Sequence, residues 1–180
     1  MLNSIKLSFA FLFFYAHPVF GSEKTITLFG FELFSGVNEY FSNAELIGKV
    51  PHYESNNNYF QLSTGNPPIR NPVFQEYDVI FDENSIIHQI GAWASVFELS
   101  FCMGAAEQWR SAFEGRFGGY FQYWEGDGGG GIYMRSYDEG YEDFFAAVSC
   151  NQYKDGTVAL VVFLRSYDLS DAISAFYDAF

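Results

Sequence analysis

The chain has 180 residues, of which 22 are Asp or Glu and 9 are Lys or Arg, so its formal net charge is −13. A surface of this sign repels phosphate backbones and anionic lipid headgroups. It therefore argues against nucleic acid and membrane surfaces as partners, and it favours basic partners or cations.

The first residues have the features of a signal peptide. Lys6 precedes an apolar run over residues 7–16, which is shorter than the roughly 20 residues that a membrane-spanning helix needs. A small residue follows the run at Gly21, as expected at a signal-peptidase site. We predict cleavage after Gly21, which removes residues 1–21. We expect residues 22–180 to form a single α+β domain, periplasmic or secreted, that does not insert into a membrane.

The predicted mature chain loses one basic residue, Lys6, and keeps 8 basic and 22 acidic residues, a formal charge of −14. Its two cysteines, Cys102 and Cys150, are expected to pair in an oxidising compartment. That bridge closes a loop of about 48 residues, which stabilises the fold by about 4 kcal/mol in the chain-entropy model. Neither cysteine lies in a Cys-x-x-Cys pair or near a histidine, so the pattern does not favour a metal site.

The N-terminal part of the mature chain predicts a strand followed by a helix. Polar and apolar residues alternate over Thr25–Phe29, as in a strand. Ser35 can then cap a short helix that reaches Ala44. Residues 51–72 are rich in Asn, Pro and Gly and are expected to be mostly loop, with a possible strand at Tyr59–Ser63.

The central part predicts a hairpin and a long helix. Two strand-like runs, 76–81 and 86–90, flank the turn-forming residues 82–85. Over residues 103–117 the large or apolar side chains recur at helical spacing, and Gly118 with Gly119 is expected to end that helix.

The C-terminal part predicts four strands and a final helix. The strands are expected at 120–124, 132–137, 144–150 and 158–164. An amphipathic helix is expected over 169–180 behind a capping Asp168. The sequence therefore predicts an α+β fold with a mainly antiparallel sheet, about three covering helices and one disulfide.

Aromatic residues are abundant, with 13 Tyr and 22 Phe in the chain. Tyr and Trp beside charged residues are favoured at recognition surfaces, because they bury a large area and keep a polar end. One predicted hairpin region concentrates such residues, and we predict that it contacts a protein partner. The candidate partner-binding residues are Tyr120, Tyr123, Trp124, Tyr133, Tyr137 and Tyr141. The same residues could instead be part of the core, or stack on sugar rings.

An enzymatic alternative depends on two histidines. Only His52 and His88 remain after signal cleavage, so a small hydrolase would use one of them with a nearby carboxylate. We expect His88 to share a strand face with Ile86 and Ile90, half-buried and hydrogen-bonded, and His52 to be solvated in a loop. The sequence has no Gly-x-Ser-x-Gly motif, so no catalytic residue is assigned and the protein is expected not to be an enzyme.

A calcium-binding alternative depends on acidic residues in neighbouring turns. Carboxylates are suitable calcium ligands, but their spacing here matches no known calcium loop. The residues are Glu125, Asp127, Asp138, Glu139, Glu142 and Asp143. We therefore assign no metal and no cofactor. Calcium or carbohydrate binding stays an alternative to the protein-partner hypothesis.

Overall fold

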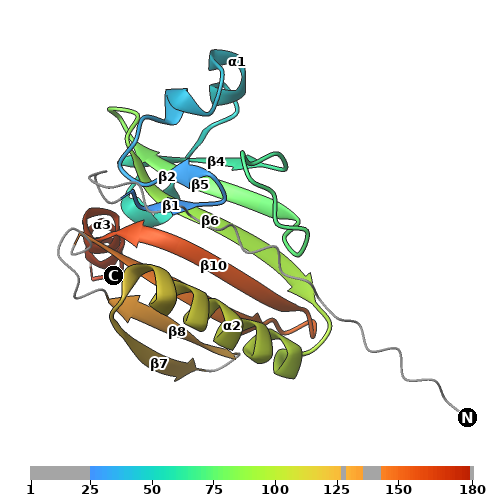
Figure 1. Cartoon of the computed structure of the whole chain (residues 1–180). Coiled ribbons are helices and arrows are strands. Elements are labelled where there is room, and N and C mark those ends of the chain that lie inside the picture. Colours follow the sequence, from blue (N-terminus) through green and yellow to red (C-terminus); the bar gives the residue numbers. More distant parts are fainter. Residues whose placement is uncertain (1–24, 127–128, 136–142, 179–180) are drawn as a thin grey trace, which may run out of the picture.

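A computed structural model describes residues 25–126, 129–135 and 143–178 (Figure 1). It confirms the predicted α+β class, with a large antiparallel sheet, three α-helices and the Cys102–Cys150 disulfide. The strands of the large sheet are β3 (Val50–Pro51), β4 (Tyr59–Thr64), β5 (Glu76–Asp82), β6 (Ile87–Val96), β7 (Tyr120–Gly126), β8 (Gly129–Arg135), β9 (Phe144–Gln152) and β10 (Val158–Ser166). The helices are α1 (Asn43–Leu46), α2 (Leu99–Phe117) and α3 (Tyr167–Tyr177).

The eight-stranded sheet is made of two four-stranded meanders that meet in the middle. Its order is β3-β4-β5-β6-β10-β9-β8-β7. Within each half, strands that are consecutive in the sequence pair with each other. The halves join where β10 pairs antiparallel with β6, in a register that runs from Val158 opposite Val96 to Arg165 opposite Gln89. Helix α2 connects the halves, because it follows β6 and precedes β7.

Helix α2 covers one face of the C-terminal half of the sheet (Figure 1) and packs on β8, β9 and β10. Its buried residues are Cys102, Ala106, Phe113 and Phe117, which recur at intervals of four or seven residues and so form one helical face. The predicted face is therefore confirmed, with Phe113 buried and Ala112 exposed. Gly118 ends the helix at a φ of +63°, a conformation that glycine adopts readily.

The first predicted strand is in fact half of a small hairpin. β1 (Thr27–Leu28) pairs with β2 (Phe31–Glu32) across the two-residue turn Phe29-Gly30. Both turn residues have positive φ, 53° and 82°, as a type I′ turn requires. The Phe29 ring packs edge-on against Phe74 and Tyr77, and this burial offsets the cost of a left-handed phenylalanine.

The predicted helix after Ser35 is wrong in its cap and its length. The segment forms a 3-10 turn, η1 (Val37–Glu39), and then the four-residue helix α1. Ser42 caps α1 by accepting a hydrogen bond from the Glu45 amide, while the Glu45 carboxylate accepts one from the Ser42 amide. The Ser35 hydroxyl instead donates to the Glu32 carbonyl oxygen, which closes the end of the hairpin.

Helix α3 follows β10 directly and packs against η2 (Tyr53–Ser55) (Figure 1). The Phe176 ring meets the Tyr53 ring edge-on, and the Tyr177 hydroxyl donates to the Glu54 carboxylate. Its cap is Ser166 and not the predicted Asp168, since the Ser166 hydroxyl accepts from the Leu169 amide. Because the cap lies two residues before Asp168, α3 begins at Tyr167 and not at the expected residue 169.

Candidate functional site

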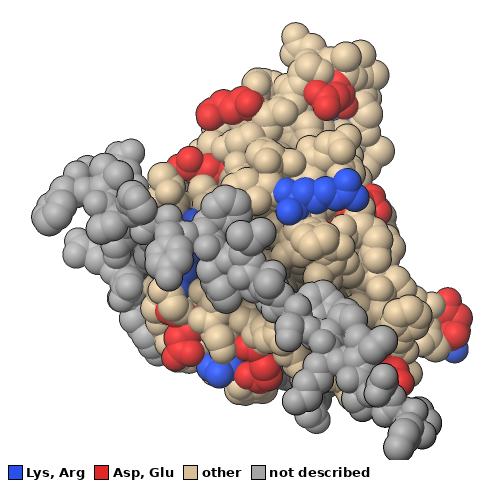
Figure 2. Space-filling view, turned by 45° about the vertical axis from the view of Figure 1, so that its right-hand side comes forward, with Lys and Arg blue, Asp and Glu red and all other residues tan. Residues whose placement is uncertain are grey.

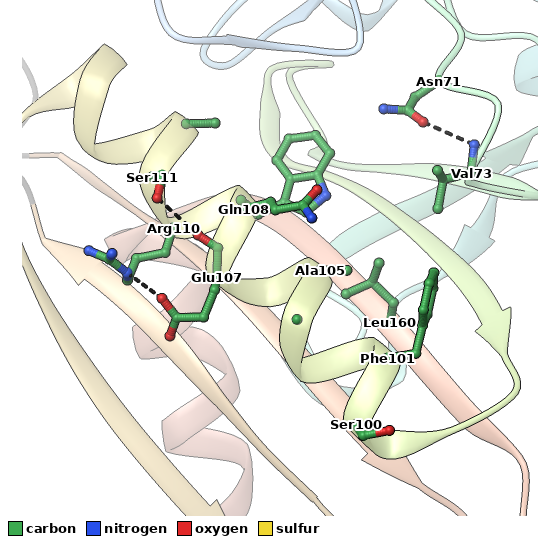
Figure 3. Close-up of a pocket in the computed structure, with 13 residues that line it drawn as sticks. Asn71, Val73, Ser100, Phe101, Ala105, Glu107, Gln108, Arg110, Ser111 and Leu160 are labelled. Atoms are coloured by element: carbon green, nitrogen blue, oxygen red, sulfur yellow. Dashed lines mark hydrogen bonds and ion pairs between the residues drawn. The ribbon is translucent and has the colours of Figure 1, made fainter. Parts of the chain in front are cut away.

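A groove of about 1080 Å³ runs between α2 and the loop before β5 (Figure 3). Most of its lining is apolar or small, which is typical of binding sites for ligands and peptide segments. The helix contributes Phe101, Gly104, Ala105, Gln108, Trp109 and Ala112, the loop contributes Asn71 and Val73, and β10 contributes Leu160. Phe101 is 57% exposed, an unusual position for a phenylalanine on a helix that already buries another face.

Trp109 connects the groove to the core. Its ring contacts Phe29, Phe74 and Phe113 at centroid distances of 5.6–5.9 Å. The indole is partly buried and packs against the hydrophobic core. Aromatic rings arranged edge-to-face or tilted in this way hold one another in position. One side of the groove is therefore a fixed aromatic surface.

The loop wall of the groove is held by Tyr77, which is completely buried. The Tyr77 hydroxyl donates to the Asn71 carbonyl oxygen at 2.7 Å and accepts from the Asn71 amide at 2.9 Å. The Asn71 side chain in turn accepts from the Val73 amide at 2.9 Å. Burial raises the pKa of Tyr77, so the phenol keeps the proton that it donates. This wall is fixed by hydrogen bonds before any ligand arrives.

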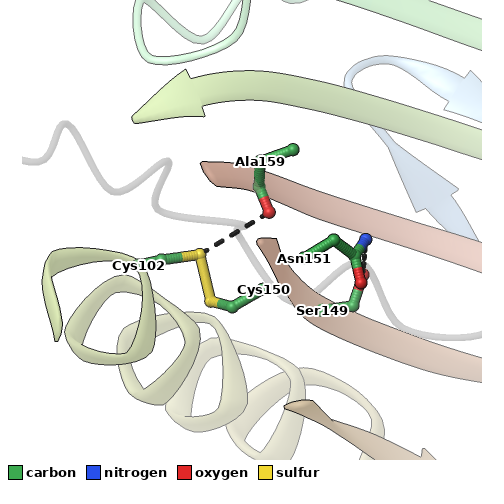
Figure 4. The surroundings of a disulfide bond; sticks show 5 residues. All are labelled: Cys102, Ser149, Cys150, Asn151 and Ala159. Atoms are coloured by element: carbon green, nitrogen blue, oxygen red, sulfur yellow. Dashed lines mark hydrogen bonds between the residues drawn. A yellow bond between two sulfur atoms is a disulfide. The ribbon is translucent and has the colours of Figure 1, made fainter. Parts of the chain in front are cut away.

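The disulfide holds the N-terminal half of α2 on the sheet (Figure 4). Cys102, next to the exposed Phe101, is bonded to Cys150 on β9, and its sulfur lies 3.8 Å from the Ala159 carbonyl oxygen. Both cysteines are fully buried, and neither is free. The predicted pairing is confirmed, and it fixes the helix that forms the groove.

The charged side chains at the rim of the groove carry a net negative charge, because one arginine faces two glutamates. Arg110 lies between Glu107 and Glu114, with nitrogen–oxygen distances of 2.7 and 3.1 Å. One guanidinium is thus shared by two carboxylates. The Tyr123 hydroxyl also donates to the Glu107 carboxylate, at 3.3 Å, which brings β7 to the same rim.

The six predicted partner-binding residues are only partly described. Tyr123 is exposed and pairs in register with Ile132, whose side chain is buried beneath α2, so Tyr123 lies on the α2 face. Tyr120 is three positions away and lies on the opposite face. Tyr137 and Tyr141 lie outside the described residues, as do the side chains of Trp124 and Tyr133.

His88 does not lie on the predicted strand face. A register shift between Ile80 and Phe81 lets Ile87 pair with Phe81, and Ile87 rather than His88 joins Ile90 in the core. The imidazole is buried and hydrogen-bonded, as expected. Its Nδ1 lies 2.9 Å from the Ser166 hydroxyl, and its Nε2 lies 3.7 Å from the Asp82 carboxylate.

The Ser166–His88–Asp82 arrangement contains the residue types of a hydrolytic triad. However, Ser166 is 1% exposed and its oxygen caps α3, whereas a nucleophile must be open to the substrate. The geometry therefore favours a structural role for His88 at the start of the helix. Sequence reasoning missed Ser166, because it follows a strand and belongs to no recognised catalytic motif.

His52 was expected to be solvated, and that expectation is wrong. Its side chain is 8% exposed, and its Nδ1 has no hydrogen-bond partner among the described residues. Burial lowers the pKa of His52, Glu54 raises it and Arg165 lowers it further. His52 is the residue that immediately precedes η2.

Most of the acidic residues considered for calcium lie outside the described side chains, and Asp143 is the exception. In the part of the chain that the structure describes, no three His, Cys, Asp or Glu side chains form a cluster suited to a metal ion. Figure 2 shows acidic side chains at several separate places on the face in view.

The groove itself was not predicted from the sequence. Its helix was predicted, but α2 begins at Leu99, four residues before the expected start at 103, and the exposed Phe101 lies in this additional turn. The sequence did contain a signal for the groove. The small side chains of Gly104, Ala105 and Ala112 leave a depression on the helix surface beside the larger Phe101 and Trp109.

No protein-family model, curated protein or solved structure matches this chain. Among the described residues, no helix is both long enough and apolar enough to cross a membrane.

Proposed function

We propose that this protein is an exported, non-catalytic binding module that holds an apolar, positively charged segment of another protein in the groove along α2. The observation that carries the proposal is the groove itself, which combines an exposed Phe101 with a fixed Trp109 surface. Aromatic side chains in preformed depressions contribute most of the affinity at many interfaces.

The groove suits a peptide segment because both of its walls are held in advance. The disulfide fixes α2, and the two Tyr77 hydrogen bonds fix the loop. A ligand that enters a preorganised site does not lose affinity to the ordering of that site. Tyr123 extends the surface at the Glu107 rim and connects the groove with the predicted aromatic region.

The negative charge of the protein and of the groove rim determines which kind of peptide segment the groove attracts. The chain has 22 acidic and 9 basic residues. Among the described residues, Arg110 is the only basic one that lines the groove, and it is already bound by Glu107 and Glu114. An acidic segment would be repelled, whereas Lys or Arg beside the apolar anchors would be attracted. Export directed by the predicted signal peptide, residues 1–21, would place the module in an oxidising compartment, where its disulfide is stable.

A selection of random displayed peptides on the oxidised protein tests this proposal. We expect the enriched peptides to combine large apolar side chains with Lys or Arg. Phe101→Asp should weaken their binding at least tenfold, because the substitution places a carboxylate in the apolar groove. Affinity is measured by fluorescence anisotropy with labelled synthetic peptides.

Phe97→Asp is the matched control. Phe97 is 101% exposed and does not line the groove, so the same substitution there should change affinity less than twofold. Both variants should keep the wild-type unfolding transition. Enriched peptides that are acidic, an absence of enrichment, or equal losses in the two variants would each contradict the proposal.

A further inference from the structure

Strand β7 forms one of the two edges of the eight-stranded sheet (Figure 1). It pairs with β8 over its whole length, from Tyr120 opposite Arg135 to Gly126 opposite Gly129, in a register without a bulge. Among the described strands, none pairs with its other side. A regular edge strand of this kind presents a row of backbone N–H and C=O groups to which another strand can bind.

The opposite edge of the sheet is protected against strand addition. Its strand, β3, has two residues, and one of them is Pro51, which has no backbone N–H. Lys49 precedes this strand, with its Nζ 4.1 Å from the centroid of the Phe60 ring. Short length, proline and lysine are the usual means of preventing edge-to-edge pairing. Residues 120–126 contain no proline and no lysine, and their one charged residue is Glu125.

The backbone groups of β7 that face away from β8 follow from the pairing. Two residues separate Gly126 from Gly129, and the pair that closes a two-residue loop is a hydrogen-bonded one. Hydrogen-bonded and non-hydrogen-bonded pairs then alternate along the strand. The residues whose N–H and C=O groups face outward are Phe121, Tyr123 and Glu125. No described residue forms a backbone hydrogen bond with the outward groups of Phe121 and Tyr123.

Helix α2 holds the edge in place before any partner binds. The Phe121 side chain packs against the core, and the Arg110 guanidinium carbon lies 5.4 Å from the centroid of its ring. The Tyr123 hydroxyl donates to the Glu107 carboxylate. Gln122 and Tyr123 point to opposite faces and are both exposed. The middle of the strand is therefore fixed on α2 and open on both faces, which lowers the entropic cost of adding a strand.

We propose that two copies of this protein associate through β7, which pairs antiparallel with β7 of the second copy about a two-fold axis at Tyr123. The outward residues are symmetric about this position, since Phe121 lies two positions before it and Glu125 two positions after it. Tyr123 then pairs with its own equivalent, and Phe121 lies opposite Glu125 of the second copy. Each of these pairs exchanges two backbone hydrogen bonds.

The positions of the charges are compatible with this pairing. The two Glu125 residues lie at opposite ends of the paired strands, about 14 Å apart along the strand direction. This separation exceeds the screening length of about 8 Å at physiological ionic strength, which also weakens the repulsion between the two acidic chains. Because the β3 edge is protected, association ends at a closed dimer. The contact uses backbone groups and does not depend on the groove along α2.

Sedimentation equilibrium of the oxidised protein in about 0.15 M sodium chloride tests the proposal. We expect a reversible equilibrium between monomer and dimer, without larger species. Tyr123→Pro removes an outward N–H that the pairing with β8 does not use. The dissociation constant of the dimer should rise at least tenfold, because each dimer loses two hydrogen bonds. Tyr123→Ala is the matched control, because it loses the same ring but keeps the N–H, and it should change the constant less than threefold.

Hydrogen exchange of the unmodified protein tests the same contact if Tyr123→Pro does not fold. With rising protein concentration, exchange of the Phe121 and Tyr123 amides should slow, whereas that of the Gln122 amide, which is bonded to β8, should stay constant. The proposal is overturned if the protein is monomeric at every concentration or forms open-ended polymers. It is also overturned if a dimer forms without slower exchange at these two amides, or if a folded Tyr123→Pro dimerises like the wild type.

Discussion

Gly91 makes space for Asp78, whose carboxylate accepts a hydrogen bond from the Gln89 side chain on the neighbouring strand. A Cβ at this position would lie 2.9 and 3.1 Å from the two Asp78 carboxylate oxygens. Gly91→Ala should therefore displace the carboxylate from Gln89 and lower the free energy of unfolding by about 1 kcal/mol. Urea denaturation measures the loss.

The same substitution in an Asp78→Ala background serves as the control. No carboxylate is present there to be displaced, so the added methyl group should cost much less. Equal losses in both backgrounds would mean that Gly91 is needed for another reason.

Asp78 should also make stability depend on pH. Burial raises its pKa above the ordinary value of 3.8, so the folded protein keeps this proton at a pH where the unfolded chain has released it. Its contribution is complete below pH 3.8 and is lost as the pH rises through the folded-state pKa. Asp78→Asn should lack this loss.

The measurement is the free energy of unfolding of both proteins from pH 3 to pH 7. Stability of the wild type relative to Asp78→Asn should fall as the pH rises. A difference that grows in favour of the wild type at higher pH would show that Asp78 is stabilised as a carboxylate instead.

At the scale of elements, the sequence predicted those whose side chains repeat with a regular period. Helix α2 and strands β5 to β10 were predicted because apolar residues recur at helical or alternating spacing. The β1–β2 hairpin was missed because its turn places Phe29 at positive φ, which only the surrounding rings favour. The face of His88 was missed because a bulge in the β5–β6 pair cannot be read from alternation.

The loop wall of the groove depends on one hydroxyl. Tyr77→Phe removes both hydrogen bonds to Asn71 and leaves its partly buried backbone amide and carbonyl without these partners. The free energy of unfolding should fall by about 1–3 kcal/mol. The Asn71 amide should exchange with solvent faster, as measured by hydrogen exchange, and groove-bound peptides should bind more weakly.

Tyr59→Phe is the corresponding control. Tyr59 is half-buried, and no hydrogen bond of its hydroxyl is found among the described residues, so its removal should change stability by no more than about 0.5 kcal/mol. Unchanged peptide affinity in Tyr77→Phe would show that the loop wall contributes nothing to the groove.

For the whole molecule, the two meanders and α2 bring together segments that are distant in sequence. The groove joins residues near 71 with residues 100–112. Hydrogen bonds from Arg165 to Gln89 and from Gln89 to Asp78 link β10, β6 and β5. The class of fold and the Cys102–Cys150 pair could be predicted, because each depends on composition and local pattern. The groove could not be predicted, since it depends on strand order, which pattern alone does not specify.

The most direct test of the binding-module proposal is an NMR map of where a selected basic, apolar peptide binds the oxidised protein. The account predicts that the largest amide and indole shifts occur at Ala105, Gln108, Trp109 and Val73, with smaller shifts at Tyr123. Shifts confined to the sheet face opposite α2, or spread without a maximum along the helix, would contradict it.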